Sequence, residues 1–207
     1  MMQSFRIWIA LLFAAMCGLG SNVSALAQDG PEVDSTYWEY DWETDCTVID
    51  ASPPEGPGAY AQLLCPGPGE LHLMLSDDDG RISLDYTKYP QFGPWESFQT
   101  FNDVARTVEW RGQRLNGDMV PFATIHRWFV GAGEQQHQFL VVNTVAHAPD
   151  AESCMVGYID ASNTPDANKM ARRVADKIAL GFRCGEDRPR AYGWVDPTTP
   201  RTTRAGH

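Results

Sequence analysis

Four cysteines spread along the chain limit what it can fold into. Cys46, Cys65, Cys154 and Cys184 lie far apart in the sequence, and the fifth cysteine, Cys17, belongs to an apolar N-terminal leader. An even set of widely spaced cysteines in an exported protein is typical of disulfides. Zinc sites usually take two ligands from within a few residues, and no two of these four are that close. We therefore predict two disulfides, for which three pairings exist, and no metal site.

The N-terminus has the features of a cleavable export signal. Arg6 precedes an apolar stretch, Ile7 to Leu19, and Ala25-Leu-Ala27 supplies small residues two positions apart. This order predicts cleavage after Ala27. A retained membrane anchor is the alternative, but the apolar stretch is shorter than the ~20 residues that a span needs. We expect a soluble, periplasmic or secreted protein, with residues 1–27 removed and no membrane span in the mature chain.

A strand followed by a helix near the C-terminus indicates how the cysteines pair. Cys154 to Asp160 has the pattern of a strand, and Asn163-Thr-Pro165 has that of a helix start. Apolar residues then recur every three or four positions as far as Phe182, as on an amphipathic helix. A strand of this length spans ~23 Å and the helix ~27 Å. A helix that folds back over its sheet therefore brings Cys184 to Cys154, which leaves Cys46 to pair with Cys65.

Turn signals between alternating segments predict two hairpins. Asp79-Gly80 lies between segments 71–75 and 81–86, and Asn116-Gly-Asp118 lies between segments 106–112 and 121–130. Further strands are expected around 38–43, 47–51, 59–65 and 138–146, and a short helix over 97–104.

The sum is an α+β fold: an antiparallel β-sheet, or two layered β units, with one long C-terminal amphipathic helix packed on a face and two disulfides. A single domain is expected over 36–186, after a flexible lead-in at 28–35. The last segment, 187–207, has no apolar period and is predicted to be disordered.

Charge and missing motifs exclude several classes of function. The net charge of −11 repels nucleic acid and is compatible with a cationic partner. The sequence has no phosphate-binding loop, no dinucleotide fingerprint and no nucleophile elbow. We therefore expect no cofactor, no nucleic-acid partner and no enzymatic activity.

The one cluster of candidate binding residues lies early in the chain. Three aromatic residues alternate there with three acids, which predicts a strand with an aromatic face and an acidic face. Such a strand either belongs to the core or presents a surface to a sugar or a protein. Its residues are Trp38, Tyr40 and Trp42, with Glu39, Asp41 and Glu43.

Other candidates have ordinary structural explanations. Glu109 is a candidate for catalysis with Asp85 or Asp103 as a second carboxylate, but we favour an ordinary structural role for it, such as a cross-strand pair with Arg127. Asp77-Asp-Asp-Gly80 lacks the alternate ligands and distal glutamate of a calcium loop. The histidines are dispersed, at positions 72, 126, 137 and 147.

These observations favour an exported, non-enzymatic envelope protein that binds a cationic protein, such as a lysozyme, or a glycan through its acidic and aromatic residues. An envelope hydrolase that uses Glu109 with a second carboxylate is one alternative, and a structural or stress-related periplasmic role is another. The sequence does not indicate an oligomeric state.

Overall fold

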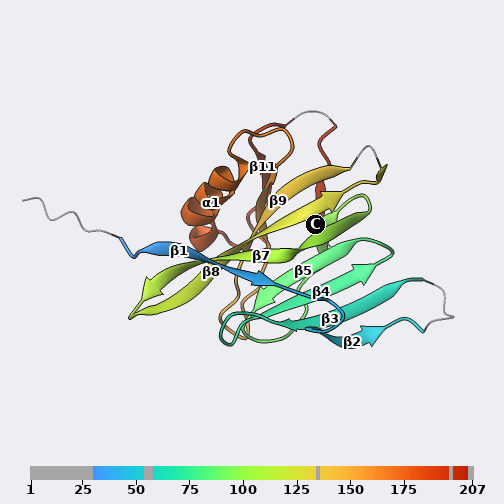
Figure 1. Cartoon of the computed structure of the whole chain (residues 1–207), viewed down its shortest axis with the longest axis horizontal. Helices are drawn as coiled ribbons and strands as arrows, with labels where there is room; N and C mark the ends of the chain where they lie inside the picture. Colours follow the sequence, from blue (N-terminus) through green and yellow to red (C-terminus); the bar gives the residue numbers. More distant parts are fainter. Residues whose placement is uncertain (1–29, 54–57, 134–135, 196–197, 205–207) are drawn as a thin grey trace, which may run out of the picture. The chain divides into compact units, whose positions relative to one another are not determined.

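The computed structural model describes residues 30–53, 58–133, 136–195 and 198–204. The predicted export signal lies outside them. The largest element is a six-stranded sheet (Figure 1). Its strands are antiparallel except that β11 runs parallel to β10. In spatial order they are β1 (Val33–Glu39), β7 (Asn102–Leu115), β8 (Asp118–Val130), β9 (His137–Thr144), β10 (Met155–Asp160) and β11 (Arg190–Tyr192).

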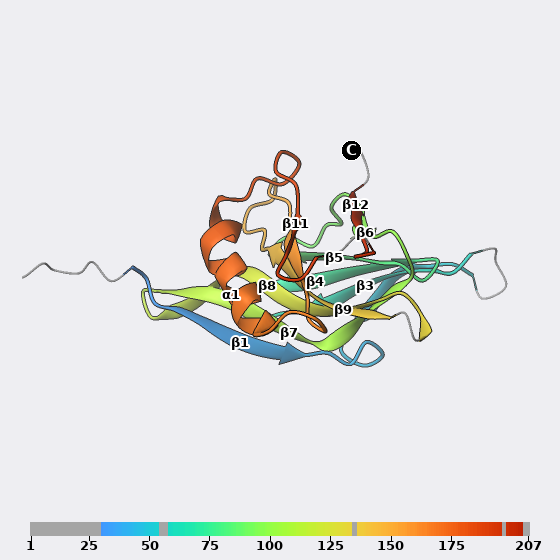
Figure 2. The ribbon, with the colours of Figure 1, turned by 90° about the horizontal axis from the view of Figure 1, so that it is seen from above.

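Two smaller sheets complete the fold. An antiparallel sheet of four strands runs in chain order, and a short pair, β6 with β12, lies beside it (Figure 2). The strands are β2 (Thr47–Ala51), β3 (Tyr60–Pro66), β4 (His72–Asp78) and β5 (Ile82–Thr87), then β6 (Glu96–Phe98) and β12 (Thr202–Arg204).

Both predicted hairpins are confirmed. The turn of β7–β8 has φ of 53° at Asn116 and 92° at Gly117, and the turn of β4–β5 has φ of 54° at Asp79 and 70° at Gly80. Positive φ at two successive positions gives a turn whose twist matches that of the flanking strands. Asparagine, aspartate and glycine tolerate this conformation, which is why the sequence marks these turns so clearly.

The centre of the six-stranded sheet is buried on both faces, because successive residues of β8 and β9 enter different cores. Trp128 and Val141 belong to a core shared with β4 and β5, whereas Ile125 and Leu140 belong to a core shared with the helix. Side chains alternate across a strand, so one apolar run serves both cores. The molecule therefore has three layers: helix, large sheet and small sheet.

The helix α1 (Ala167–Ile178) packs on β8, β9 and β10 through small residues and ends in a 3₁₀ turn, Ala179–Gly181. It begins later than the capping pattern predicts. Asp160 accepts the backbone N–H groups of Ser162 and Asn163, so the chain first makes a tight turn. The residue before the helix is Asp166, with φ of 55° and no side-chain cap.

Both predicted disulfides are present, with Cys46 bonded to Cys65 and Cys154 bonded to Cys184. The first joins the residue before β2 to β3. The second joins the start of β10 to the segment that follows the helix, as the folding back of the helix requires. The fold class predicted from the sequence is therefore confirmed. Among the described residues, no helix is long and apolar enough to cross a membrane.

Three segments differ from their predictions. The segment 97–104 forms β6 and the start of β7 instead of a helix, because Asn102 accepts Ile82 N–H and donates to Gly80 O through its own N–H. The chain beyond Asp187 contributes β11 and β12 where disorder was predicted. Strand β1 begins at Val33, inside the predicted lead-in.

Candidate functional site

The predicted aromatic and acidic strand does not form one surface. β1 ends at Glu39, and the ring of Tyr40 is fully buried. Tyr40 stacks on Trp42 at a centroid distance of 5.4 Å, and Trp42 packs on the core between the sheets. Trp38 stays partly exposed. Two of the three aromatic residues are thus core, because the chain turns directly after β1 and the alternation no longer corresponds to the two faces of a strand.

The acids of this region remain at the surface. We call Tyr37–Ala51 the acidic segment: it contains five carboxylates and no lysine or arginine. Asp41 accepts Glu43 N–H and pairs with Arg106 at 3.3 Å. Within the described part of the chain, the other four carboxylates form no ion pair; they are Glu39, Glu43, Asp45 and Asp50.

The acidic segment ends in β2, an edge strand that pairs with β3 and with no other strand that the structure describes. All five of its residues are exposed, including Val48 at 60% and Ile49 at 50%. The register of β2 against β3 shifts between Val48 and Asp50, so Val48 and Ile49 lie at a bulge that exposes apolar surface. The disulfide at Cys46 fixes the start of this strand against β3.

Glu109 is held in a structural network rather than in an open site. It is 7% exposed, accepts Nε of Arg172 at 2.6 Å and accepts the hydroxyl of Ser35 at 2.6 Å. The proposed catalytic partners lie elsewhere: Asp85 is on β5 in the other sheet, and Asp103 is six residues away on β7, ~20 Å along the strand.

The alternative cross-strand pair of Glu109 with Arg127 is not formed either. Arg127 donates to the side chain of Gln138 on β9. The arginine that meets Glu109 comes from the helix, an approach that strand alternation alone does not reveal.

His126 is buried in the core as a neutral ring. Its Nδ1 accepts the hydroxyl of Tyr86 at 2.8 Å, and its Nε2–H donates to Ala105 O at 2.6 Å. Burial lowers the pKa of His126 to about 4, although the bond to Ala105 opposes this. In the described ranges, no three His, Cys, Asp or Glu residues are placed to hold a metal ion.

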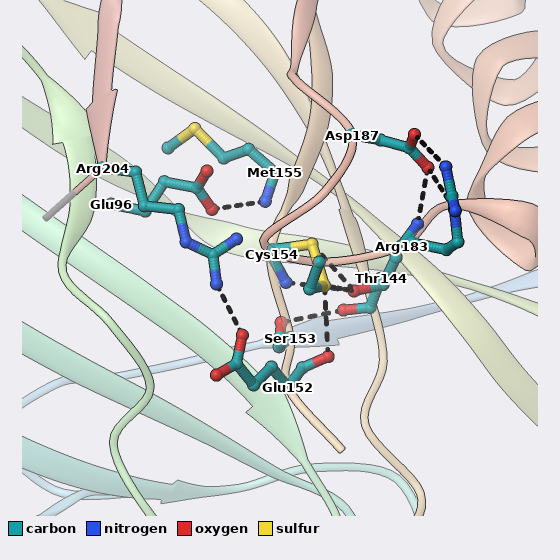
Figure 3. The surroundings of a disulfide bond; sticks show 10 residues. Glu96, Thr144, Glu152, Ser153, Cys154, Met155, Arg183, Asp187 and Arg204 are labelled. Atoms are coloured by element: carbon teal, nitrogen blue, oxygen red, sulfur yellow. Dashed lines mark hydrogen bonds and ion pairs between the residues drawn. A yellow bond between two sulfur atoms is a disulfide. The ribbon is translucent and has the colours of Figure 1, made fainter. Parts of the chain in front are cut away.

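A second group of charged residues lies near Cys154–Cys184, and the sequence did not suggest that they meet. Figure 3 shows Glu96, Glu152 and Arg204 of this group, and Asp85 lines a small pocket together with Glu152. We call Asp85, Glu96, Glu152 and Arg204 the carboxyl cluster. Arg204 on β12 pairs with Glu152 at 2.6 Å. Glu96 on β6 accepts Met155 N–H at 2.6 Å through Oε2, and Asp85 on β5 accepts Gly93 N–H at 3.0 Å.

Two of these carboxyls are unusual in their proton affinity. Asp85 and Glu96 are each 6% exposed. Burial raises the pKa of each to about 7, while a backbone N–H bond and the charge of Arg204 oppose the rise. Carboxyl groups with strongly shifted pKa values in a cleft are candidates for a functional site. The sequence gives little sign of them, because Asp85 is one of three polar residues that alternate with apolar ones in β5, a strand that proves to be entirely buried.

A cavity of about 510 Å³ opens beside Glu96. Its walls come from the chain after Cys184 and from β6 and β12, and include Gln99, Arg188 and Arg204. Oε1 of Glu96 has no hydrogen-bond partner among the residues that the structure describes. This volume lies in the ~300–1,000 Å³ range of small-molecule sites.

The structure thus offers two surfaces that are not explained by packing: the exposed edge of the acidic segment and the cavity beside Glu96. No family model, no curated protein and no solved structure matches this chain.

Proposed function

We propose that the chain is an exported, non-enzymatic protein that binds a basic protein partner along the acidic segment, with the edge of β2 at the centre of the contact. The observation that supports this proposal most directly is the exposure of β2. Val48 and Ile49 are at least half exposed on a strand with a free edge. The bulge between Val48 and Asp50 interrupts this edge, so a partner would contact the two apolar side chains there and form main-chain hydrogen bonds beside the bulge.

The negative charge of the acidic segment favours a basic protein as its partner. The acidic segment has four carboxylates without an ion pair among the described residues and no basic residue of its own. Opposite charge on a partner speeds the encounter and rejects acidic competitors. A basic protein therefore suits this edge better than a second copy of this acidic chain.

The absence of enzymatic activity is part of the same proposal. Glu109 already accepts hydrogen bonds from Arg172 and Ser35 and is nearly inaccessible. A general acid or base needs to reach its substrate directly or through one water molecule. Its hydrogen bonds instead suit a role in attaching α1 to the sheet.

Binding can be measured by titration calorimetry with two basic probes, lysozyme and cytochrome c, and the chain from Gln28 onward. We expect binding that weakens steeply with added salt. Val48→Ser with Ile49→Ser should weaken it at least tenfold by removing apolar contact. Glu43→Lys with Asp50→Lys should do so by reversing charge.

Matched controls lie on the tip of the β7–β8 hairpin, where Leu115 and Asp118 are exposed. Leu115→Ser and Asp118→Lys should leave binding unchanged. Failure to bind either probe, or equal binding by all variants, would contradict the proposal. Self-association that Ile49→Ser abolishes would replace the basic partner with a second copy.

Export is tested separately. The intact mass of the protein recovered from the periplasm or medium should correspond to a chain that begins at Gln28 with all four remaining cysteines oxidised. A chain that retains Met1 and has titratable thiols would overturn the predicted compartment. The two disulfides support export, because such bonds persist in oxidising compartments.

A further inference from the structure

The wall of the cavity beside Glu96 contains the mostly buried carboxylate of this residue. Glu96 is 6% exposed, and its carboxylate is fixed from one side by Met155 N–H on Oε2 (Figure 3). Oε1 has no partner among the described residues, and Glu96 lines the cavity. Oε1 is not among the fully enclosed side-chain atoms that lack a partner, so it is open to the cavity and not sealed in the core. The cavity is the direction from which a donor can come.

The charged groups around Glu96 do not fully balance its negative charge. Three carboxyls of the carboxyl cluster, Asp85, Glu96 and Glu152, face one guanidinium, Arg204. Arg204 bonds directly to Glu152 at 2.6 Å and acts on Glu96 only through its charge. A second positive charge in the cavity would balance Glu96 without disturbing this pair.

The opposite end of a ligand would meet a positive side chain. Arg188 lines the cavity, is exposed, and forms no ion pair with any residue that the structure describes. The other two acids of the wall, Glu186 and Asp187, are both paired with Arg183. Among the described residues of the wall, the charged groups that form no ion pair are therefore the carboxylate of Glu96 and the guanidinium of Arg188.

We propose that this cavity binds a small zwitterion, an amino acid or a short peptide, whose ammonium group donates to Oε1 of Glu96 and whose carboxylate pairs with Arg188. A volume of about 510 Å³ accommodates a ligand of this size. Gln99, Thr202 and Thr203 supply further polar groups on the wall. This site is independent of the acidic segment and of the partner proposed for it.

Alanyl-alanine is the probe, titrated into the chain from Gln28 onward by calorimetry. We expect a dissociation constant at or below about 1 mM. N-acetyl-alanyl-alanine lacks the ammonium group and should bind at least tenfold more weakly. Alanyl-alanine amide lacks the carboxylate and should lose affinity to a smaller extent, because Arg188 is exposed to solvent.

Variants of the cavity wall distinguish binding in the cavity from a general effect of charge on binding. Glu96→Gln keeps an acceptor for Met155 N–H and should weaken binding at least tenfold, and Arg188→Ala should weaken it less. Arg173→Ala removes the same charge from an exposed position of α1 and should have no effect. If Glu96→Gln does not fold by circular dichroism, Gln99→Trp, at an exposed position of the wall, should block the cavity instead.

Proton release gives a readout that packing alone would not produce. Burial raises the pKa of Glu96 to about 7, so an ammonium group that binds its ionised form should release protons. The heat of binding at pH 7 should therefore differ between phosphate and Tris buffers, and Glu96→Gln should remove the difference. No binding of alanyl-alanine, or binding equal in the folded Glu96→Gln variant, would overturn the proposal.

Discussion

Arg172 on the helix holds Glu109 on β7 with two hydrogen bonds, Nε to Oε1 at 2.6 Å and Nη2 to Oε2 at 3.2 Å. Next to them, Arg111 holds Asp176 with Nε and Nη2 at 2.7 and 2.9 Å. Four residues of a helix rise ~6 Å, and two residues of a strand rise ~6.7 Å. The two spacings match, so opposite charges on α1 and β7 meet in pairs and fix the position of the helix along the strand.

Removing one member of this network should destabilise the fold. Arg172→Met would leave the nearly buried Glu109 carboxylate with Ser35 as its remaining hydrogen-bond partner among the described residues. We expect the free energy of unfolding to fall by about 2 kcal/mol, below the full cost of a buried pair because Arg172 is partly exposed. Urea denaturation measures it. Arg173→Met, at an exposed neighbouring position, serves as control and should change stability by less than about 0.5 kcal/mol.

The two disulfides should both stabilise the fold. The double replacement of Cys154 and Cys184 by alanine opens a loop with a sequence separation of 30, and that of Cys46 and Cys65 opens one of 19. Each should reduce the free energy of unfolding by about 3–4 kcal/mol, the first slightly more because its loop is longer. Calorimetric unfolding of the two variants tests this. Equal stability of wild type and both variants would show that the crosslinks are dispensable.

Stability should depend on pH through Asp85 and Glu96. Their folded pKa values of about 7 lie above the unfolded values, so the folded state binds more protons between about pH 4 and 7. Their contribution is complete below about pH 4 and is lost as pH rises through 7. Glu96→Gln should therefore gain stability relative to wild type by about 2 kcal/mol between pH 5 and pH 8. A difference that does not change with pH would contradict this assignment.

The contribution of His126 to the free energy of unfolding should have the opposite dependence on pH. Its folded pKa of about 4 lies below the unfolded value of about 6.5, so its contribution is complete above about pH 6.5 and is lost as pH falls through 4. Tyr86→Phe would remove the hydroxyl that donates to Nδ1. At pH 7 we expect a loss of about 1–3 kcal/mol from the unsatisfied buried nitrogen, measured by urea denaturation.

The parts of the fold that the sequence predicted are those set by local chemistry. Asp79-Gly80 and Asn116-Gly117 adopt positive φ, and few residues other than these types do so readily. The pairing of Cys154 with Cys184 followed from the lengths of one strand and one helix. Such features depend on neighbours in the chain, and a single sequence displays them directly.

The parts of the fold that could not be predicted from the sequence depend on contacts between distant segments. Strands of three residues, such as β11 and β12, are too short to show a period. Tyr40 and Trp42 continue an alternation whose strand has already ended at Glu39. The carboxyl cluster takes its four residues from β5, β6, β12 and the loop before β10, and no local pattern marks that meeting.

The placement of β11 and β12 has a consequence for how the native state is reached. β11 covers the outer edge of β10, and β12 pairs with β6 and brings Arg204 to Glu152. A chain that leaves a ribosome or a translocation channel with its N-terminus first delivers these segments after every other strand. Until then the outer edge of β10 lacks its neighbouring strand, so we expect the six-stranded sheet to be completed only after these last segments have been delivered.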